Sequence, residues 1–226
     1  MKAFIGLSGL AISLITIPAA IADKHTDLVT TLNRLMTGLD GAFDSGAQIQ
    51  SEKLSNTPEN YWHQHVYRSF LRIDAPNVGE NVFVATVRDG GYNGPIDMIE
   101  FQVWTLDIDK ESDAVIMTPH RFRTPEAYAL MTRTPSAFKN LSAKDLMNSD
   151  GAAGCPIYWE SLPSGLIRGT SKIPCLGPIR DQMLSWNWTY ILSETALWIS
   201  FAGRNDSGAI AFGRQDQMPW RLDKIE

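Results

Sequence analysis

Aromatic side chains alternate with polar ones in residues 185–193. Trp186, Trp188 and Tyr190 fall on alternate positions, so an extended strand would place them together on one face. A row of such rings is suited to lining a cavity for an apolar ligand. Most of the seven tryptophans are nevertheless expected in the core, because aromatic side chains bury a large area.

A second strand-like stretch, residues 96–106, has one apolar face and one face that mixes polar and aromatic groups. The mixed face includes Glu100 and Trp104. A face of this kind suits either solvent or a ligand cavity with apolar walls and a few placed polar groups. The alternation alone leaves both interpretations open.

Other chemistries have weaker support. His63 and His65 stand two apart, as two metal ligands on one face of a strand would. The remaining histidines, His25 and His120, offer no evident third ligand, so we interpret the pair as hydrogen-bonded or solvated side chains.

After the first 22 residues the chain has neither a Gly-x-Ser-x-Gly turn nor a glycine-rich phosphate loop, so hydrolase and nucleotide chemistry are unsupported.

The charge of the chain argues against nucleic acid as a partner. The 226 residues carry a formal net charge of −5, and the basic residues are scattered along the sequence. No positive surface that could neutralise phosphates is therefore predicted.

An export signal is predicted at the N-terminus. Lys2 precedes an uncharged apolar run, and the small residues before Asp23 form a cleavage site after Ala22. The run is shorter than the roughly 20 apolar residues that a membrane span needs. We expect removal of residues 1–22, no transmembrane segment afterwards, and a single domain over residues 23–226 in the periplasm or outside the cell.

The two cysteines are expected to form a disulfide, because an exported chain meets oxidising conditions. Cys155 and Cys175 flank two short strand-like runs that meet at a turn around Gly165. An antiparallel hairpin folded at this glycine would place the two cysteines opposite each other. A metal site built on them lacks two further ligands at suitable spacing.

The remaining pattern predicts a mainly β fold. Leucines at helical spacing behind Thr26 or Asp27 predict one amphipathic helix that ends near Gly38. Short helical segments are expected at residues 125–131 and, capped by Ser142, at residues 143–147. The predicted strands are residues 62–74, 81–88, 96–107, 114–118, 156–161, 166–172, 184–193, 196–202, 209–214 and 220–224. Such strands need either two stacked sheets or a closed barrel, and the pattern leaves both open.

Several motifs of the last third of the chain follow one another in a recognisable order. A Gly-Cys step with an aromatic residue soon after, a Gly-Thr step, a second cysteine, a Tyr-x-Leu-Ser-Glu strand, an Asp-x-Gly turn and a Phe-Gly step occur in turn. In this order the chain resembles the CpcT/CpeT family of phycobiliprotein chromophore lyases. The matching segments are residues 154–159, 165–170, 175, 189–194, 206–208, 212–214 and 219–222, with weaker matches at residues 32–48, His65 and Arg68.

The resemblance implies a calycin-like or lipocalin-like antiparallel β-barrel with an N-terminal helix. It further implies that the barrel holds a bilin, an open-chain tetrapyrrole, and attaches it to a cysteine of an acceptor protein. The attacking thiolate belongs to the acceptor, so such a lyase acts by positioning its ligand and requires no cofactor. Arg68 is then expected to meet a propionate and Glu100 the pyrrole nitrogens. The expected ring walls are Trp104, Trp186, Trp188 and Tyr190.

Two alternatives stay open. The first is a non-enzymatic exported barrel that binds another apolar small ligand. It is favoured by the export signal, because phycobiliproteins are built in the cytoplasm, and by residues 96–101, which lack the family's Tyr-Arg-x-Arg run. The second is an envelope protein whose surface carries the function and whose barrel is a scaffold.

Overall fold

The computed structural model describes residues 19–147, 155–179 and 182–225, and its main feature is an antiparallel sheet that closes into a barrel. The sheet order is β11-β10-β12-β1-β2-β3-β4-β5-β6-β7-β9-β8, and an additional pairing of β9 with β10 closes ten of these twelve strands into a ring, which leaves out β8 and β11. The strands are β1 (Gly41–Asp44), β2 (Val66–Ile73), β3 (Val82–Asp89), β4 (Gln102–Asp109), β5 (Ala114–Arg121), β6 (Ile157–Ser161), β7 (Ile167–Thr170), β8 (Cys175–Ile179), β9 (Gln182–Leu192), β10 (Ala196–Arg204), β11 (Ile210–Phe212) and β12 (Trp220–Ile225). The predicted calycin-like barrel is confirmed, and the alternative of two stacked sheets is wrong.

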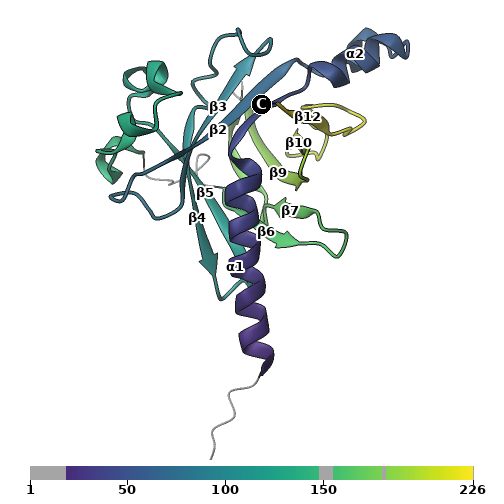
Figure 1. The fold of residues 1–226 in the computed structure, drawn as a ribbon. Coiled ribbons are helices and arrows are strands. Elements are labelled where there is room, and N and C mark those ends of the chain that lie inside the picture. The colour runs from purple at the N-terminus through teal and green to yellow at the C-terminus, as the bar shows by residue number, and fades with distance from the viewer. Residues whose placement is uncertain (1–18, 148–154, 180–181, 226) are drawn as a thin grey trace, which may run out of the picture.

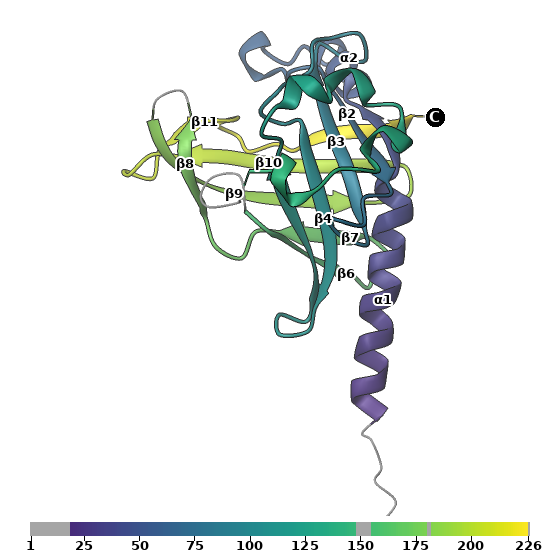
Figure 2. The same ribbon diagram turned by 90° about the vertical axis from the view of Figure 1, so that its left-hand side faces the viewer.

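The helices lie at the ends and on one face of this barrel (Figure 1). They are α1 (Ala19–Leu39), α2 (Gly46–Leu54) and the short 3₁₀ turns η1 (Glu59–Tyr61), η2 (Pro125–Ala127), η3 (Ala129–Met131), η4 (Pro135–Phe138) and η5 (Ala143–Asp145). The first turns of α1 extend beyond the barrel (Figures 1 and 2). Within the described residues, no helix has the length and apolar character needed to cross a membrane.

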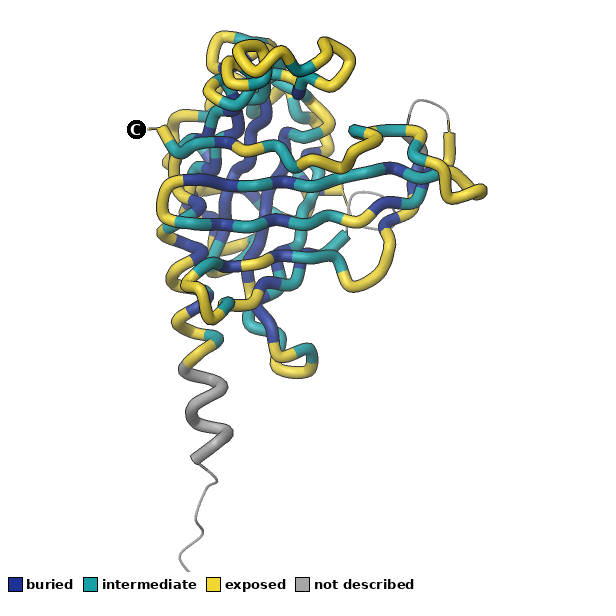
Figure 3. Tube along the Cα trace, turned by 90° about the vertical axis from the view of Figure 1, so that its right-hand side faces the viewer, coloured by how far each residue is buried: buried dark blue, intermediate teal, exposed yellow. Residues whose placement is uncertain are grey.

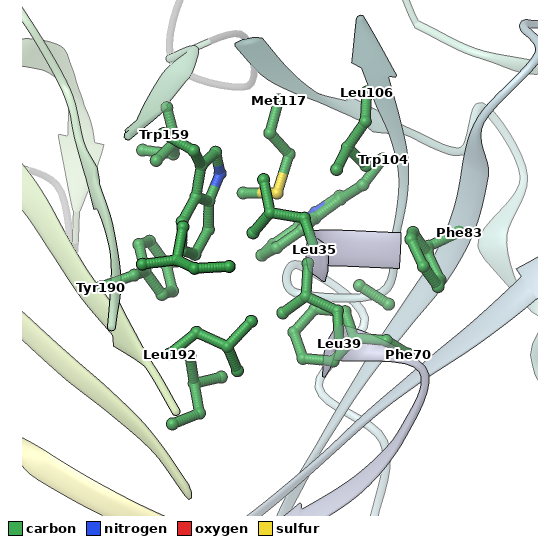
Figure 4. Close-up of a cluster of buried hydrophobic side chains, with 14 of the residues drawn as sticks. Leu35, Leu39, Phe70, Phe83, Trp104, Leu106, Met117, Trp159, Tyr190 and Leu192 are labelled. Carbon is green, nitrogen blue, oxygen red and sulfur yellow. The ribbon is translucent and has the colours of Figure 1, made fainter. Parts of the chain in front are cut away.

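The last turns of α1 close one end of the barrel. Leu35 and Leu39 are fully buried, and Figure 4 shows them between the wall that carries Phe83 and the wall that carries Leu192. Gly38 allows this close approach, because a Cβ there would lie 2.9 Å from Cδ2 of Leu192. The barrel interior is therefore a packed core at the α1 end.

A second layer covers the outer face of the sheet beside β3 and β4. Phe101, Phe122 and Phe138 are buried there with Leu141 and Leu146. Ser142 forms the predicted cap of η5, a capping box with Asp145. The short helical turns thus protect one face of the sheet from solvent.

Beyond the barrel, β8 to β11 form a four-stranded extension that we call the arm. It consists of β8, residues 182–187 of β9, residues 200–204 of β10, and β11. Figures 2 and 3 show it projecting from the side of the barrel. The inner face of the arm carries Leu184 and Trp186, which are buried.

Several predicted boundaries are wrong for local reasons. The strand predicted at residues 96–107 begins only at Gln102, because Asp97 Oδ1 accepts hydrogen bonds from the backbone N–H groups of Ile99 and Glu100 and turns the chain. The strand predicted from residue 62 begins at Val66. The first helix begins at Ala19, ahead of the expected cap at Thr26 or Asp27, since neither proline nor glycine occurs between Ala19 and Gly38. Residues 1–18 of the predicted signal lie outside the described residues.

The disulfide is present, but the hairpin that predicted it has a different register. The Cα atoms of Cys155 and Cys175 are 5.7 Å apart. In the β6–β7 hairpin Tyr158 pairs with Thr170, a register that would place residue 155 opposite residue 173. Cys175 instead begins β8, where it pairs with Trp186 of β9. The bond therefore joins the arm to the start of β6.

Candidate functional site

The end of the barrel opposite α1 contains a cavity of about 550 Å³. At this end β2, β4, β6, β9 and β12 begin and β3, β5 and β10 end. The inner face of the arm continues its wall through Trp186, Phe201 and Phe212. The volume lies in the range of small-molecule sites, and the walls are mostly apolar with a few polar groups.

All six residues predicted for the ligand site line this one cavity. They are Arg68, Glu100, Trp104, Trp186, Trp188 and Tyr190. The alternation within β9 explains three of them, because residues 186, 188 and 190 all face inward. That they bind a ligand remains a prediction.

Arg68 is the buried cation of the cavity. Its Nη2 donates a hydrogen bond to Oε2 of Glu100 at 3.1 Å, and the side chains of Arg68 and Glu100 are 6% and 29% exposed. The guanidinium lies 5.9 Å from the centre of the Trp104 ring. Among the described residues, Nε and Nη1 of Arg68 have no hydrogen-bond partner. Because a buried charge is costly when it is incompletely paired, this guanidinium is suited to an additional acceptor.

Tyr190 is a close neighbour of the ion pair between Arg68 and Glu100. Burial raises the pKa of Tyr190 to about 12, an effect that the neighbouring Arg68 partly offsets. The phenol is therefore neutral at physiological pH. Trp188 stacks on Tyr190 at 5.7 Å between ring centres and on Phe201 at 4.4 Å, so the three rings form a continuous wall.

The side-chain amide of Gln102 holds Trp104 and the turn with Glu100 in position. Its Oε1 accepts a hydrogen bond from Nε1 of Trp104 at 2.9 Å, and its Nε2 donates to the backbone oxygen of Ile99 at 3.0 Å. The first contact orients the indole beneath Arg68. The second holds the turn that carries Glu100 against β4.

Two carboxylates occupy the rim of the cavity. Asp89 and Asp97 both line it. Burial and the neighbouring Asp97 raise the pKa of Asp89. The rim therefore disfavours negative charge, whereas the guanidinium of Arg68 deeper in the cavity favours it.

Sequence reasoning missed a second cation, Arg121. It is the last residue of β5 and lines the cavity, and its buried Nε has no partner within the described part of the chain. The predicted strand ended at Thr118, but β5 continues through Pro119 and Arg121 pairs with Gln102. Phe201 and Trp220 were also missed, although the alternation of Ile199 with Phe201 was a usable signal.

The two neighbouring histidines, His63 and His65, contact different carboxylates. The Nε2 atom of His63 lies 3.1 Å from the backbone oxygen of Met218, and its Nδ1 contacts Glu52. His65 instead contacts Asp44, with 2.9 Å between Nε2 and Oδ1. Within the described residues, no cluster of three or more potential ligands is present. The interpretation of hydrogen-bonded side chains is confirmed.

Comparisons with known proteins add little to this geometry. No family model matches the chain, and no curated protein matches its sequence. Among solved structures, the T-type phycobiliprotein lyase CpeT from Prochlorococcus phage P-HM1 is similar, with a TM-score of 0.48 and 12% sequence identity over 86% of this chain and 98% of that one. This is a distant structural relationship. Membership of the lyase family stays a prediction.

Proposed function

We propose that the cavity binds an elongated, largely apolar ligand that carries a carboxylate, and that this ligand is a bilin. One observation supports the proposal above all. Among the residues that the structure describes, the buried guanidinium of Arg68 has two nitrogens without hydrogen-bond partners, and it lies in a cavity with aromatic walls. A carboxylate would complete its hydrogen bonds, and the rings of Trp188 and Tyr190 would pack against a conjugated ligand.

The sequence resemblance selects a bilin among such ligands. Arg68 would hold one propionate, Glu100 would accept hydrogen bonds from the pyrrole nitrogens, and Arg121 adds a second cation. The open cavity would present the ligand to the cysteine of an acceptor protein, so the chain would act as a lyase by positioning. The disulfide is compatible with the proposed export to the periplasm or the exterior, after removal of residues 1–22.

A non-enzymatic barrel for another apolar ligand is the second candidate. The ion pair of Arg68 with Glu100 favours it, because any ligand with one carboxylate could compete with Glu100 for the guanidinium. That contact does not require the ligand to be a tetrapyrrole. A fatty acid meets this requirement. The two candidates differ in whether the cavity prefers a conjugated open-chain tetrapyrrole over an acyl chain.

Quenching of tryptophan fluorescence separates these candidates. The protein is titrated with biliverdin, with a reduced bilin and with a fatty acid. Saturable quenching by the bilins alone supports the proposed function. Binding of the fatty acid alone supports the second candidate, and no binding of any ligand contradicts both.

A matched pair of variants tests the role of Arg68. Arg68→Met is expected to weaken bilin binding by about 10- to 100-fold, because a charged hydrogen bond is lost. Arg168→Met is the control, since Arg168 pairs with Glu160 on the exposed outside of the barrel. Equal affinity of the two variants would contradict the assignment of Arg68.

A further inference from the structure

The inner face of the arm has a small hydrophobic cluster of its own. Cys175, Leu184 and Trp186 are buried in it, and Phe201 and Phe212 pack against them. The main core of the barrel is a different cluster, and Trp188 is the residue that packs against both. So few buried side chains provide little stability, and we therefore expect the arm to depend on its connections to the barrel.

The arm is connected to the barrel by continuous strands, by short main-chain links and by the disulfide. β9 and β10 continue into it from the barrel wall, whereas β8 and β11 are the two ends of the sheet order. Within the described part of the chain, β8 pairs along one edge, with β9. The main chain of residues 171–174 links the start of β8 to β7. The disulfide between Cys175 of β8 and Cys155, two residues ahead of β6, adds a cross-link from the barrel end of β8 to the start of β6.

One cysteine of this disulfide lines the cavity. Cys155 is half-buried and lines the cavity, whereas Cys175 is 1% exposed beneath the arm. A small reductant that enters the open mouth therefore reaches the sulfur of Cys155 first. Cys175 is buried in the same cluster as Trp186, and Cys155 and Phe212 pack against that cluster. Trp186 and Phe212 form the arm side of the cavity wall.

We propose that the Cys155–Cys175 disulfide is a redox-sensitive brace that holds the arm against the barrel and so completes the cavity wall. A dithiol reductant converts the bond to two thiols and is itself oxidised to a disulfide. β8 is then held by its pairing with β9 and by the main chain that joins it to β7. The arm then opens locally while the α1 end of the barrel stays folded. The oxidised protein captures ligand and the reduced protein releases it, a consequence that rests on the proposed function.

Hydrogen–deuterium exchange read by mass spectrometry tests the brace without any ligand. The full chain is compared oxidised and after treatment with dithiothreitol. We expect amide exchange in β8 and in residues 182–187 to rise by at least about tenfold on reduction, because local opening becomes easier. Exchange in β2, β3 and β4 is expected to change by less than about twofold.

The double variant Cys155→Ser/Cys175→Ser is the matched control. It should show fast exchange in the arm under both conditions and no response to dithiothreitol. Unchanged protection of β8 on reduction would overturn the proposal. Loss of protection throughout the barrel would also overturn it, because the bond would then stabilise the whole fold.

Titration with biliverdin separates this inference from the proposed function. If the oxidised protein binds biliverdin, reduction should weaken binding by about tenfold or more, in line with a cavity wall lost by local opening. Equal affinity of the two states would contradict the link to the ligand. If the oxidised protein binds none, the proposed function fails and the exchange experiment still decides on the brace.

Discussion

The two ends of the barrel are built from the same strands but differ in composition and packing. At the α1 end Leu35, Leu39 and Phe83 are fully buried and fill the interior. At the other end the strands carry Arg68 and Gln102, and a cavity of about 550 Å³ remains. An interior that served stability alone would be apolar and filled at both ends. The difference agrees with the proposed function, in which the closed end stabilises the fold and the open end binds the ligand.

The largest expected effect tests the closed end. Leu39→Ala should lower the free energy of unfolding by about 2–5 kcal/mol, because a fully buried side chain is replaced by a void. Ile99→Ala at the mouth of the cavity should change it by less than about 0.5 kcal/mol, because Ile99 is 61% exposed. Urea denaturation of both variants measures the two values. Similar losses of unfolding free energy in the two variants would contradict the difference in packing between the two ends of the barrel.

Tyr190 belongs to both the core and the cavity, and alkaline pH tests its burial. Its pKa is raised from 10.0 to about 12, so the folded state keeps the phenolic proton longer than the unfolded state does. The resulting stability is fully present below pH 10 and is lost as pH rises towards about 12, a loss of roughly 2–3 kcal/mol. Tyr190→Phe should remove that part of the pH dependence. Denaturation experiments between these pH values measure the effect. If the variant and the wild-type protein lose stability equally as pH rises, Tyr190 is exposed to solvent.

Gln102→Leu should have an intermediate effect. The variant loses the acceptor for Trp104 and the donor to Ile99, which we expect to cost about 1–3 kcal/mol. Bilin binding should weaken as well, because the turn with Glu100 is released. Thr105→Val on the same strand is the control, since Thr105 does not line the cavity. Loss of stability with unchanged affinity would make Gln102 a purely structural residue.

Asp89→Asn should have the smallest effect. The raised pKa of Asp89 means that folding disfavours its charged form, so the native carboxylate destabilises the protein above its pKa and this penalty disappears as pH falls. The amide should therefore raise the melting temperature slightly at neutral pH and leave it unchanged in acid. Calorimetry at the two pH values measures this, and a lower melting temperature at neutral pH would contradict it.

The sequence predicts the aromatic wall of the cavity on β9, because strand alternation is a local property. Trp186, Trp188 and Tyr190 share a face in any extended strand, whatever the strand pairs with. Arg121 could not be placed in this way, because its inward position depends on the register of β5 with β4 across the barrel. β8 was missed since Pro174 and Pro178 interrupt the strand pattern. β1 has only four residues, too few for a period to be read.

A crystal structure of the protein soaked with biliverdin would test the central claim most directly. We predict electron density for the ligand in the cavity, with one carboxylate within hydrogen-bond distance of the Arg68 guanidinium and a ring against Trp188. A ligand bound on the outer surface, or a cavity closed by rearranged side chains, would contradict the assignment of function to the open end.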